Sequence, residues 1–124
     1  KDYINTTTLV NSYQGKKLNS PNDIVVKSDG TIWFTDPPYG ILSDYEGYSG
    51  KQEYGTCYVF RYNPSSKNLA VVLKDLDRPN GIAFSQDEKI IYIYIIYLYL
   101  YTHIYHNYKI IVILYFQYNY SAIF

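Results

Sequence analysis

Two Pro-Asn pairs carry the side chains in this sequence that are best suited to chemistry. Asn22 follows Pro21, and Asn80 follows Pro79. The amide oxygen of asparagine is a hard ligand of the kind that Ca²⁺ binds, and a metal with an open coordination position polarises a carbonyl group. The alternative is structural, because the asparagine of such a pair commonly caps a turn through its side-chain amide. The residues alone leave both interpretations open.

The two pairs begin segments that resemble each other. Residues 21–32 align without a gap on residues 79–90, an offset of 58 residues, and apolar positions fall opposite apolar positions. Repetition of a four-stranded unit builds β-propellers, and equivalent side chains of related blades would point to one axis. The alternative is an ordinary antiparallel sheet in which two hairpins share their turn chemistry.

A long loop explains the size of the offset. The 58 residues exceed the roughly 40–50 residues of a typical blade, and the Gly- and Tyr-rich stretch at 39–55 accommodates the excess. A loop of this kind on a rigid scaffold is an expected place for contacts to a substrate.

The elements that would position these residues are short strands. Runs rich in β-branched and aromatic residues lie between turn signals at 24–26, 31–35, 57–62 and 69–73. Each run is too short for a helix, so we predict strands and an all-β fold. Ser28-Asp29-Gly30 suits a tight hairpin, which predicts that the first two strands pair antiparallel. We assign residues 1–90 to this β-structure.

The sequence after residue 90 has a different composition. Ten of the 18 tyrosines lie between Tyr92 and Tyr120, and no Asp, Glu, Gly or Pro follows Glu88. The dominant residues have codons rich in A and T, so we interpret residues 91–124 as an aberrant Tyr- and Ile-rich tail from a translated intron or a frame error. The alternative is a transmembrane helix, but polar residues interrupt the apolar window, and tyrosine is typical of membrane interfaces.

Charge and cysteine content limit the classes of partner. With 11 basic and 11 acidic residues the net charge is zero, which predicts no nucleic-acid partner and no attraction to an anionic membrane. Cys57 is the only cysteine, so we expect a small buried thiol and no intramolecular disulfide. No signal-peptide pattern is visible, which slightly favours the cytoplasm. The sequence indicates no specific protein partner.

Longer motifs make a family resemblance specific. Residues 15–30, with Pro21-Asn22-Asp23-Ile24, and residues 32–40, with Trp33-Phe34-Thr35-Asp36-Pro37-Pro38-Tyr39-Gly40, resemble the gluconolactonase branch of the family of gluconolactonases and senescence marker protein (regucalcin). Residues 78–88 resemble the next blade of that family. The resemblance covers about residues 8–92.

The resemblance implies a six-bladed β-propeller that hydrolyses sugar lactones. It implies one divalent cation, usually calcium, in the central channel, bound by side chains from the innermost strands of different blades. On this basis Asn80 matches a metal-ligand asparagine, and Asn22 matches an asparagine near the substrate and the metal-bound water. Asp36 and Tyr39 are the other candidate substrate contacts, because they lie where a strand enters the long loop. Asp23 either supports the site or holds the turn.

We expect the chain to be a fragment of about one and a half to two blades. It begins at Lys1 and contains no methionine, and the resemblance implies that the family's glutamate ligand and acidic base lie outside it. We therefore expect a calcium-dependent sugar-lactone hydrolase as the parent and no activity from the fragment alone. The alternatives are a non-catalytic propeller that binds partners, or a non-functional product of an erroneous gene model.

Overall fold

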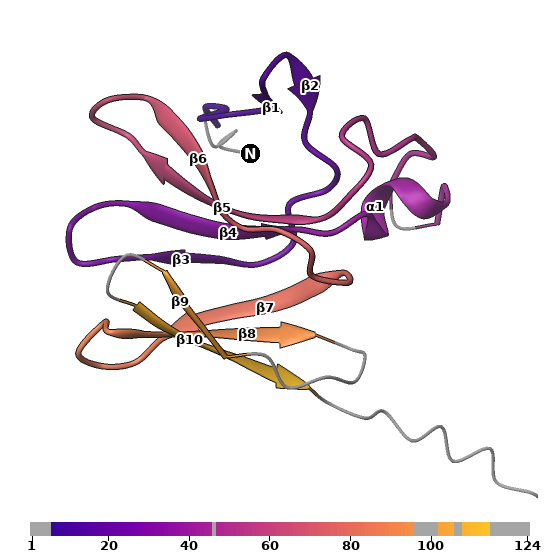
Figure 1. Cartoon of the computed structure of the whole chain (residues 1–124). Coiled ribbons are helices and arrows are strands. Elements are labelled where there is room, and N and C mark those ends of the chain that lie inside the picture. Colours follow the sequence, from indigo (N-terminus) through magenta and orange to yellow (C-terminus); the bar gives the residue numbers. More distant parts are fainter. Residues whose placement is uncertain (1–5, 46, 96–101, 106–107, 115–124) are drawn as a thin grey trace, which may run out of the picture.

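The computed structural model of the chain describes residues 6–45, 47–95, 102–105 and 108–114, and only the backbone of the last two segments. In the described segments the fold is almost entirely β-structure, with one four-residue helix (Figure 1). No helix among the described residues has the length and apolarity that a membrane span requires. The elements are β1 (Ser12–Tyr13), β2 (Lys16–Lys17), β3 (Ile24–Val26), β4 (Ile32–Asp36), α1 (Tyr39–Leu42), β5 (Tyr58–Asn63), β6 (Asn68–Leu73), β7 (Pro79–Phe84), β8 (Ile90–Ile95), β9 (Thr102–Tyr105) and β10 (Tyr108–Leu114).

Strands β3, β4, β5 and β6 form a four-stranded sheet in chain order, and every neighbouring pair is antiparallel. This meander confirms the strands predicted from the sequence, with boundaries that differ by at most one residue. It also has the strand number and connectivity of a propeller blade. The long loop lies between β4 and β5 and contains α1 (Figure 1).

The hairpin predicted between β3 and β4 is present, and the second segment of the repeat forms the same turn. Gly30 donates its N–H to the Lys27 carbonyl at 2.9 Å, and Glu88 donates to the Ser85 carbonyl at 2.8 Å. Gly30 has φ +79° and its counterpart Glu88 has φ +54°. Both turns therefore need a left-handed residue at this point, where only the first uses glycine.

The repeat slips by one residue after this turn. Lys27 N–H bonds to the Thr31 carbonyl, whereas Ser85 N–H bonds to the Ile90 carbonyl, so the second turn holds one more residue. Phe84 consequently pairs with Ile91 in the β7–β8 register. A shift of one residue exchanges the two faces of a strand. In β8 the isoleucines therefore face the first sheet, where without the shift the tyrosines of β8 would face it.

The second sheet has the order β7-β8-β10-β9. Strands β7 and β8 are antiparallel, as in the first sheet, but β10 runs parallel to β8. The second sheet therefore begins as a blade and departs from the meander of the first. Strand β8 also crosses the boundary that we predicted at residue 90, and the other residues of the predicted tail lie in β9, in β10 or outside the described residues.

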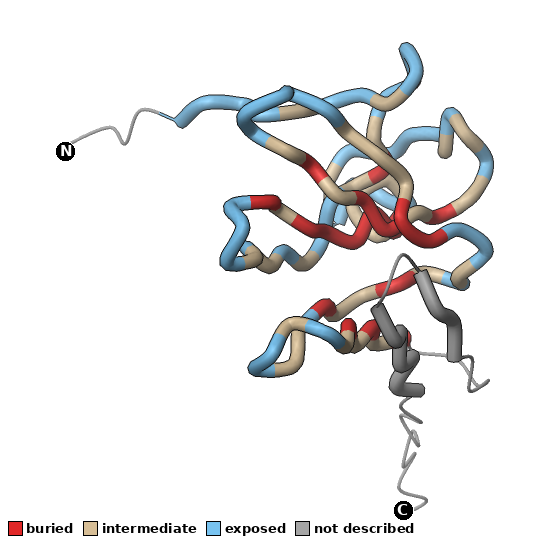
Figure 2. The backbone as a smooth tube through the Cα atoms, turned by 60° about the vertical axis from the view of Figure 1, so that its left-hand side comes forward, coloured by how far each residue is buried: buried red, intermediate tan, exposed pale blue. Residues whose placement is uncertain are grey.

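A hydrophobic core lies between the two sheets. Trp33 and Val59 contribute from the first sheet, and Ile91, Ile93 and Ile95 contribute from β8. The Trp33 ring meets the ring of Phe84 of β7 edge-on, with the centroids 5.2 Å apart. Figure 2 shows that buried segments occur in both sheets. This contact between sheets is how neighbouring propeller blades stabilise each other.

The opposite face of the first sheet carries a second core. Phe34, Phe60 and Tyr62 are buried there, and Val10 and Tyr13 of the N-terminal segment pack against them. The rings of Tyr13 and Phe60 lie 5.3 Å apart. The N-terminal segment thus covers this face over β4 and β5, while Ile24 and Val26 of β3 stay exposed.

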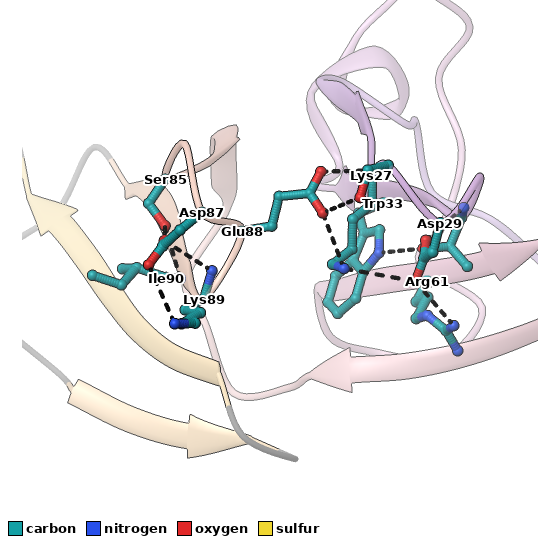
Figure 3. A network of polar contacts seen from close by, with 11 residues as sticks. Lys27, Asp29, Trp33, Arg61, Ser85, Asp87, Glu88, Lys89 and Ile90 are labelled. Atoms are coloured by element: carbon teal, nitrogen blue, oxygen red, sulfur yellow. Dashed lines mark hydrogen bonds and ion pairs between the residues drawn. The ribbon is translucent and has the colours of Figure 1, made fainter.

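Glu88 joins the turns of the two hairpins. Its carboxylate accepts hydrogen bonds from Ser28 N–H at 2.7 Å and from Ser28 Oγ at 2.6 Å, and it lies 3.1 Å from Lys27 Nζ (Figure 3). The hydrogen bonds from Ser28, with the charge of Lys27, hold the pKa of Glu88 below its usual value. These contacts fix the two sheets relative to each other at the end opposite the Pro-Asn pairs.

The substitution Ile93→Val tests whether β8 is packed as an integral strand. Ile93 is fully buried between the sheets, so loss of one methylene is expected to lower the free energy of unfolding by about 1 kcal/mol. Ile24→Val is the matched control, because Ile24 is 61% exposed and the same change there is expected to have little effect. Urea denaturation of both variants measures the difference, and equal effects would contradict the packing.

Candidate functional site

Thr35 brings the two Pro-Asn pairs together. Its carbonyl oxygen accepts a hydrogen bond from Asn22 N–H at 3.0 Å, and its Oγ1 donates to the Asn80 carbonyl at 2.6 Å. Thr35 is fully buried in β4, next to β3 and β7. The backbones of Asn22 and Asn80 therefore lie at the same end of β3 and β7, and the direction of their side chains toward one axis stays a prediction.

Asp23 makes a second link between the two sheets. Its Oδ1 accepts from Ile24 N–H at 2.9 Å within the turn, and its Oδ2 accepts from Ile82 N–H of β7 at 2.8 Å. Asp23 N–H also donates to Thr35 Oγ1 at 3.2 Å. One carboxylate thus binds the backbone next to it and also the strand that carries Asn80, while support of a functional site by Asp23 stays a prediction.

Tyr39 lies beside Asn80. The Tyr39 hydroxyl donates to the Arg78 carbonyl at 3.2 Å, and the Asn80 side chain lies near enough to lower the pKa of the phenol. Burial raises the pKa of the Tyr39 phenol above its ordinary value, so this hydroxyl keeps its proton at neutral pH. Tyr39 of α1 is therefore tied to the residue that precedes the Pro79-Asn80 pair of β7, while Asn22 is exposed.

Asp36 has a different environment from the other candidates. Its carboxyl group is fully buried, its Oδ2 accepts from Asn19 N–H at 2.9 Å, and the same oxygen accepts a short hydrogen bond from the Tyr54 hydroxyl. Burial raises its pKa from 3.8 to about 6, and backbone hydrogen bonds from Asn19 and Ser20 oppose that rise. These partners are distinct from Asn22 and Asn80, so the substrate contact of Asp36 stays a prediction.

The amide oxygens at the Pro-Asn pairs are of the type that a hard cation binds, but there are few of them. Ca²⁺ takes six to eight oxygens, and Asn22 and Asn80 offer one amide oxygen each. Among the residues that the structure describes, no group of three or more His, Cys, Asp or Glu side chains could hold a metal ion. The two asparagines therefore fit as part of a ligand set.

Sequence reasoning did not identify Thr35 and Asn19 as important to the site. Thr35 lies in a predicted strand, and the residues near it in the sequence do not indicate a partner for its hydroxyl group. Asn19 stands two residues before Pro21 and was read as part of a motif, although its side-chain amide is buried and hydrogen-bonded to the Asp36 and Thr56 carbonyls. Both residues act through contacts with segments distant in sequence.

One complete antiparallel four-stranded sheet, packed against the first hairpin of a repeated unit, defines this chain as part of a β-propeller. The sequence model of the "SMP-30/Gluconolactonase/LRE-like region" matches residues 2–95. The chain belongs to this family, as the motifs around Asn22 and Asn80 predicted.

Known members are similar along the same part of the chain. A gluconolactonase of Zymomonas mobilis is 39% identical over 87 residues, which are 70% of this chain and 24% of that protein. The lactonohydrolase oryL of Aspergillus oryzae is 34% identical over 88 residues, 71% of this chain and 20% of that protein. The structure of a gluconolactonase from Xanthomonas campestris is 45% identical, with a TM-score of 0.65 over 68% of this chain and 28% of that one. This chain thus spans about a quarter of the length of these relatives.

The substitution Thr35→Val tests the junction of the two sheets. It preserves shape but leaves the Asn80 carbonyl and Asp23 N–H without the hydroxyl that now pairs with both. We expect a loss of about 1–3 kcal/mol in the free energy of unfolding. Thr7→Val is the control at an exposed site, and equal denaturation midpoints for the two variants would contradict the assignment.

The raised pKa of Asp36 predicts a distinctive dependence of stability on pH. Because the folded-state pKa of about 6 exceeds the ordinary 3.8, the stabilisation by protonated Asp36 is complete below pH 3.8 and is lost as pH rises through about 6. Relative to the variant Asp36→Asn, the chain should lose about 3 kcal/mol over this window. Denaturation of both proteins between pH 4 and pH 7, with a ¹³C titration of the Asp36 carboxyl, measures it. Parallel stability curves would contradict burial of an ionisable group.

Proposed function

We propose that this chain supplies one blade and the first hairpin of the next, and with them part of the active site, of a calcium-dependent sugar-lactone hydrolase. The observation that carries the proposal is that Asn22 and Asn80 both hydrogen-bond to Thr35 through their backbones, in a chain of the gluconolactonase family. The similar proteins named above are a gluconolactonase and a lactonohydrolase, which supports a lactone as the class of substrate.

In this proposal the two asparagines have related roles. The Asn80 amide oxygen is a ligand of the divalent cation, and Asn22 holds the substrate or the attacking water and lies close enough to the cation to share in binding it. A bound divalent cation supplies Lewis-acid polarisation of the lactone carbonyl and lowers the pKa of water. The Tyr39 hydroxyl, whose proton is donated to the Arg78 carbonyl, orients the Asn80 amide and accepts a hydrogen bond from a substrate hydroxyl.

A polar pocket beside these residues offers room for a sugar ring. It has a volume of about 360 Å³ and lies between the long loop, which contributes Gln52 and Thr56, and the β6–β7 connection, which contributes Asp77 and Arg78. Amide, hydroxyl and carboxylate groups of this kind bind the hydroxyl groups of a sugar. Arg78 also connects the pocket to Tyr39 through its carbonyl oxygen.

A chimera tests the proposal without requiring activity from the chain alone. Residues 8–92 would replace the corresponding segment of the Xanthomonas campestris gluconolactonase, to which this chain is 45% identical. We expect the chimera to hydrolyse gluconolactone and to lose activity when calcium is chelated. Asn80→Ala should lower kcat/KM at least about 100-fold, because it removes a group that acts on developing charge. Asn68→Ala, at an exposed position of β6, is the control.

The outcomes separate the alternatives. Full activity of the Asn80→Ala chimera would contradict the metal assignment. A folded chimera that lacks lactonase activity would favour a propeller that only binds its partner. A chimera that does not fold, while the parent gluconolactonase does, would favour a non-functional product.

A further inference from the structure

The long loop between β4 and β5 is folded back on itself. Tyr48 N–H donates to the Gly40 carbonyl at 3.1 Å, and Gly50 N–H donates to the Ile41 carbonyl at 2.9 Å. Gly47 passes so close to Gly40 that a Cβ atom at residue 47 would lie 2.1 Å from the Gly40 carbonyl oxygen. The middle of the loop therefore rests on α1, which begins with Tyr39.

Asn19 holds both ends of this loop with one side chain. Its Nδ2 donates to the Asp36 carbonyl and to the Thr56 carbonyl, each at 3.0 Å. An amide group has two N–H donors, and here they reach the residues that precede and end the loop. Asn19 is 7% exposed, so loss of these donors would leave two carbonyl groups poorly satisfied.

The Asp36 carboxyl group adds a second closure at the same place. It accepts from Asn19 N–H and from the Tyr54 hydroxyl, so the last part of the loop is tied back to the strand from which the loop starts. The Tyr54 ring stacks on the Tyr58 ring with a centroid distance of 4.9 Å. Asn19, Asp36 and Tyr54 together form what we call the loop clasp.

The clasp is connected by short covalent links to the candidate site. Ser20, next to Asn19, donates from Oγ to the Pro37 carbonyl at 2.6 Å and accepts from Gly40 N–H at 2.9 Å. Tyr39 lies between Pro37 and Gly40, the two loop residues that Ser20 contacts. Asn22 lies two residues after Ser20 in the chain. The segment of residues 19–22 thus contacts the loop through Asn19 and Ser20 and also contains the Pro21-Asn22 pair.

We propose that the loop clasp of Asn19, Asp36 and Tyr54 is a positioning device, which closes the β4–β5 loop and so holds Tyr39 against the Arg78 carbonyl, next to the Pro79-Asn80 pair. The three residues act through Tyr39 and the Pro-Asn segment and do not touch substrate. The consequence for catalysis rests on the proposed function, whereas the closure of the loop does not.

Hydrogen exchange of the whole 124-residue chain, followed by NMR, tests the clasp directly. Tyr54→Phe removes the hydroxyl and keeps the ring stack, so exchange of the loop amides of Tyr48 and Gly50 should accelerate at least about tenfold, with a much smaller change for amides of the β5–β6 ladder. Tyr58→Phe is the matched control, because it removes a hydroxyl from the other ring of the same stack.

Two further readouts report on position. Tyr54→Phe should shift the side-chain amide resonances of Asn80, which are sensitive to the position of the Tyr39 ring held at the Arg78 carbonyl, while Tyr58→Phe should leave them in place. Asn19→Asp, which replaces both N–H donors with a carboxylate, should release the loop more strongly than Tyr54→Phe, or unfold the chain altogether. Neither readout depends on lactone hydrolysis, so failure of the proposed function would leave this result interpretable.

The proposal is overturned if Tyr54→Phe leaves loop exchange and the Asn80 resonances unchanged. It is also overturned if loop and ladder amides accelerate equally, because the hydroxyl would then contribute only to general stability. Selective acceleration in the loop together with displaced Asn80 resonances supports it.

Discussion

The side chains of β4 alternate between two hydrophobic cores, and the other contacts of the structure depend on this alternation. Trp33 enters the core between the two sheets, and Phe34 enters the core on the opposite face. Because both faces are buried, polar side chains at the end of the strand must find partners within the protein. Thr35 finds them in the strand of the next sheet, and Asp36 finds them at the base of the long loop.

The two sheets are consequently joined at three places of different chemistry. Apolar side chains fill the middle, and the hydrogen bonds Asp23–Ile82 and Thr35–Asn80 lie at the end with the Pro-Asn pairs. Glu88 joins the turns at the other end. A cation or substrate held between neighbouring blades requires such fixed placement, since ligands from different blades must converge without rearrangement. Under the proposed function, the hydrogen bonds of this junction would hold the Pro-Asn pairs in place for such a ligand.

The second sheet shows where the blade pattern ends. Strands β7 and β8 follow the pattern of the family, and the family match ends with residue 95. Beyond it, β10 joins β8 in parallel. A parallel neighbour needs a crossover connection in place of a hairpin, which a propeller blade does not contain. The change in composition after residue 90 and the change in topology thus occur close together in the sequence.

Local sequence determined the strands of the first sheet, its hairpin at Ser28-Asp29-Gly30 and the family motifs around Asn22 and Asn80, because propensity, turn chemistry and motif are properties of neighbouring residues. Only the tertiary structure decided the one-residue slip before β8, the partners of Thr35 and the clasp at Asn19. Those features depend on hydrogen bonds between segments far apart in the chain, and such partners become defined only when the two cores bring the segments together.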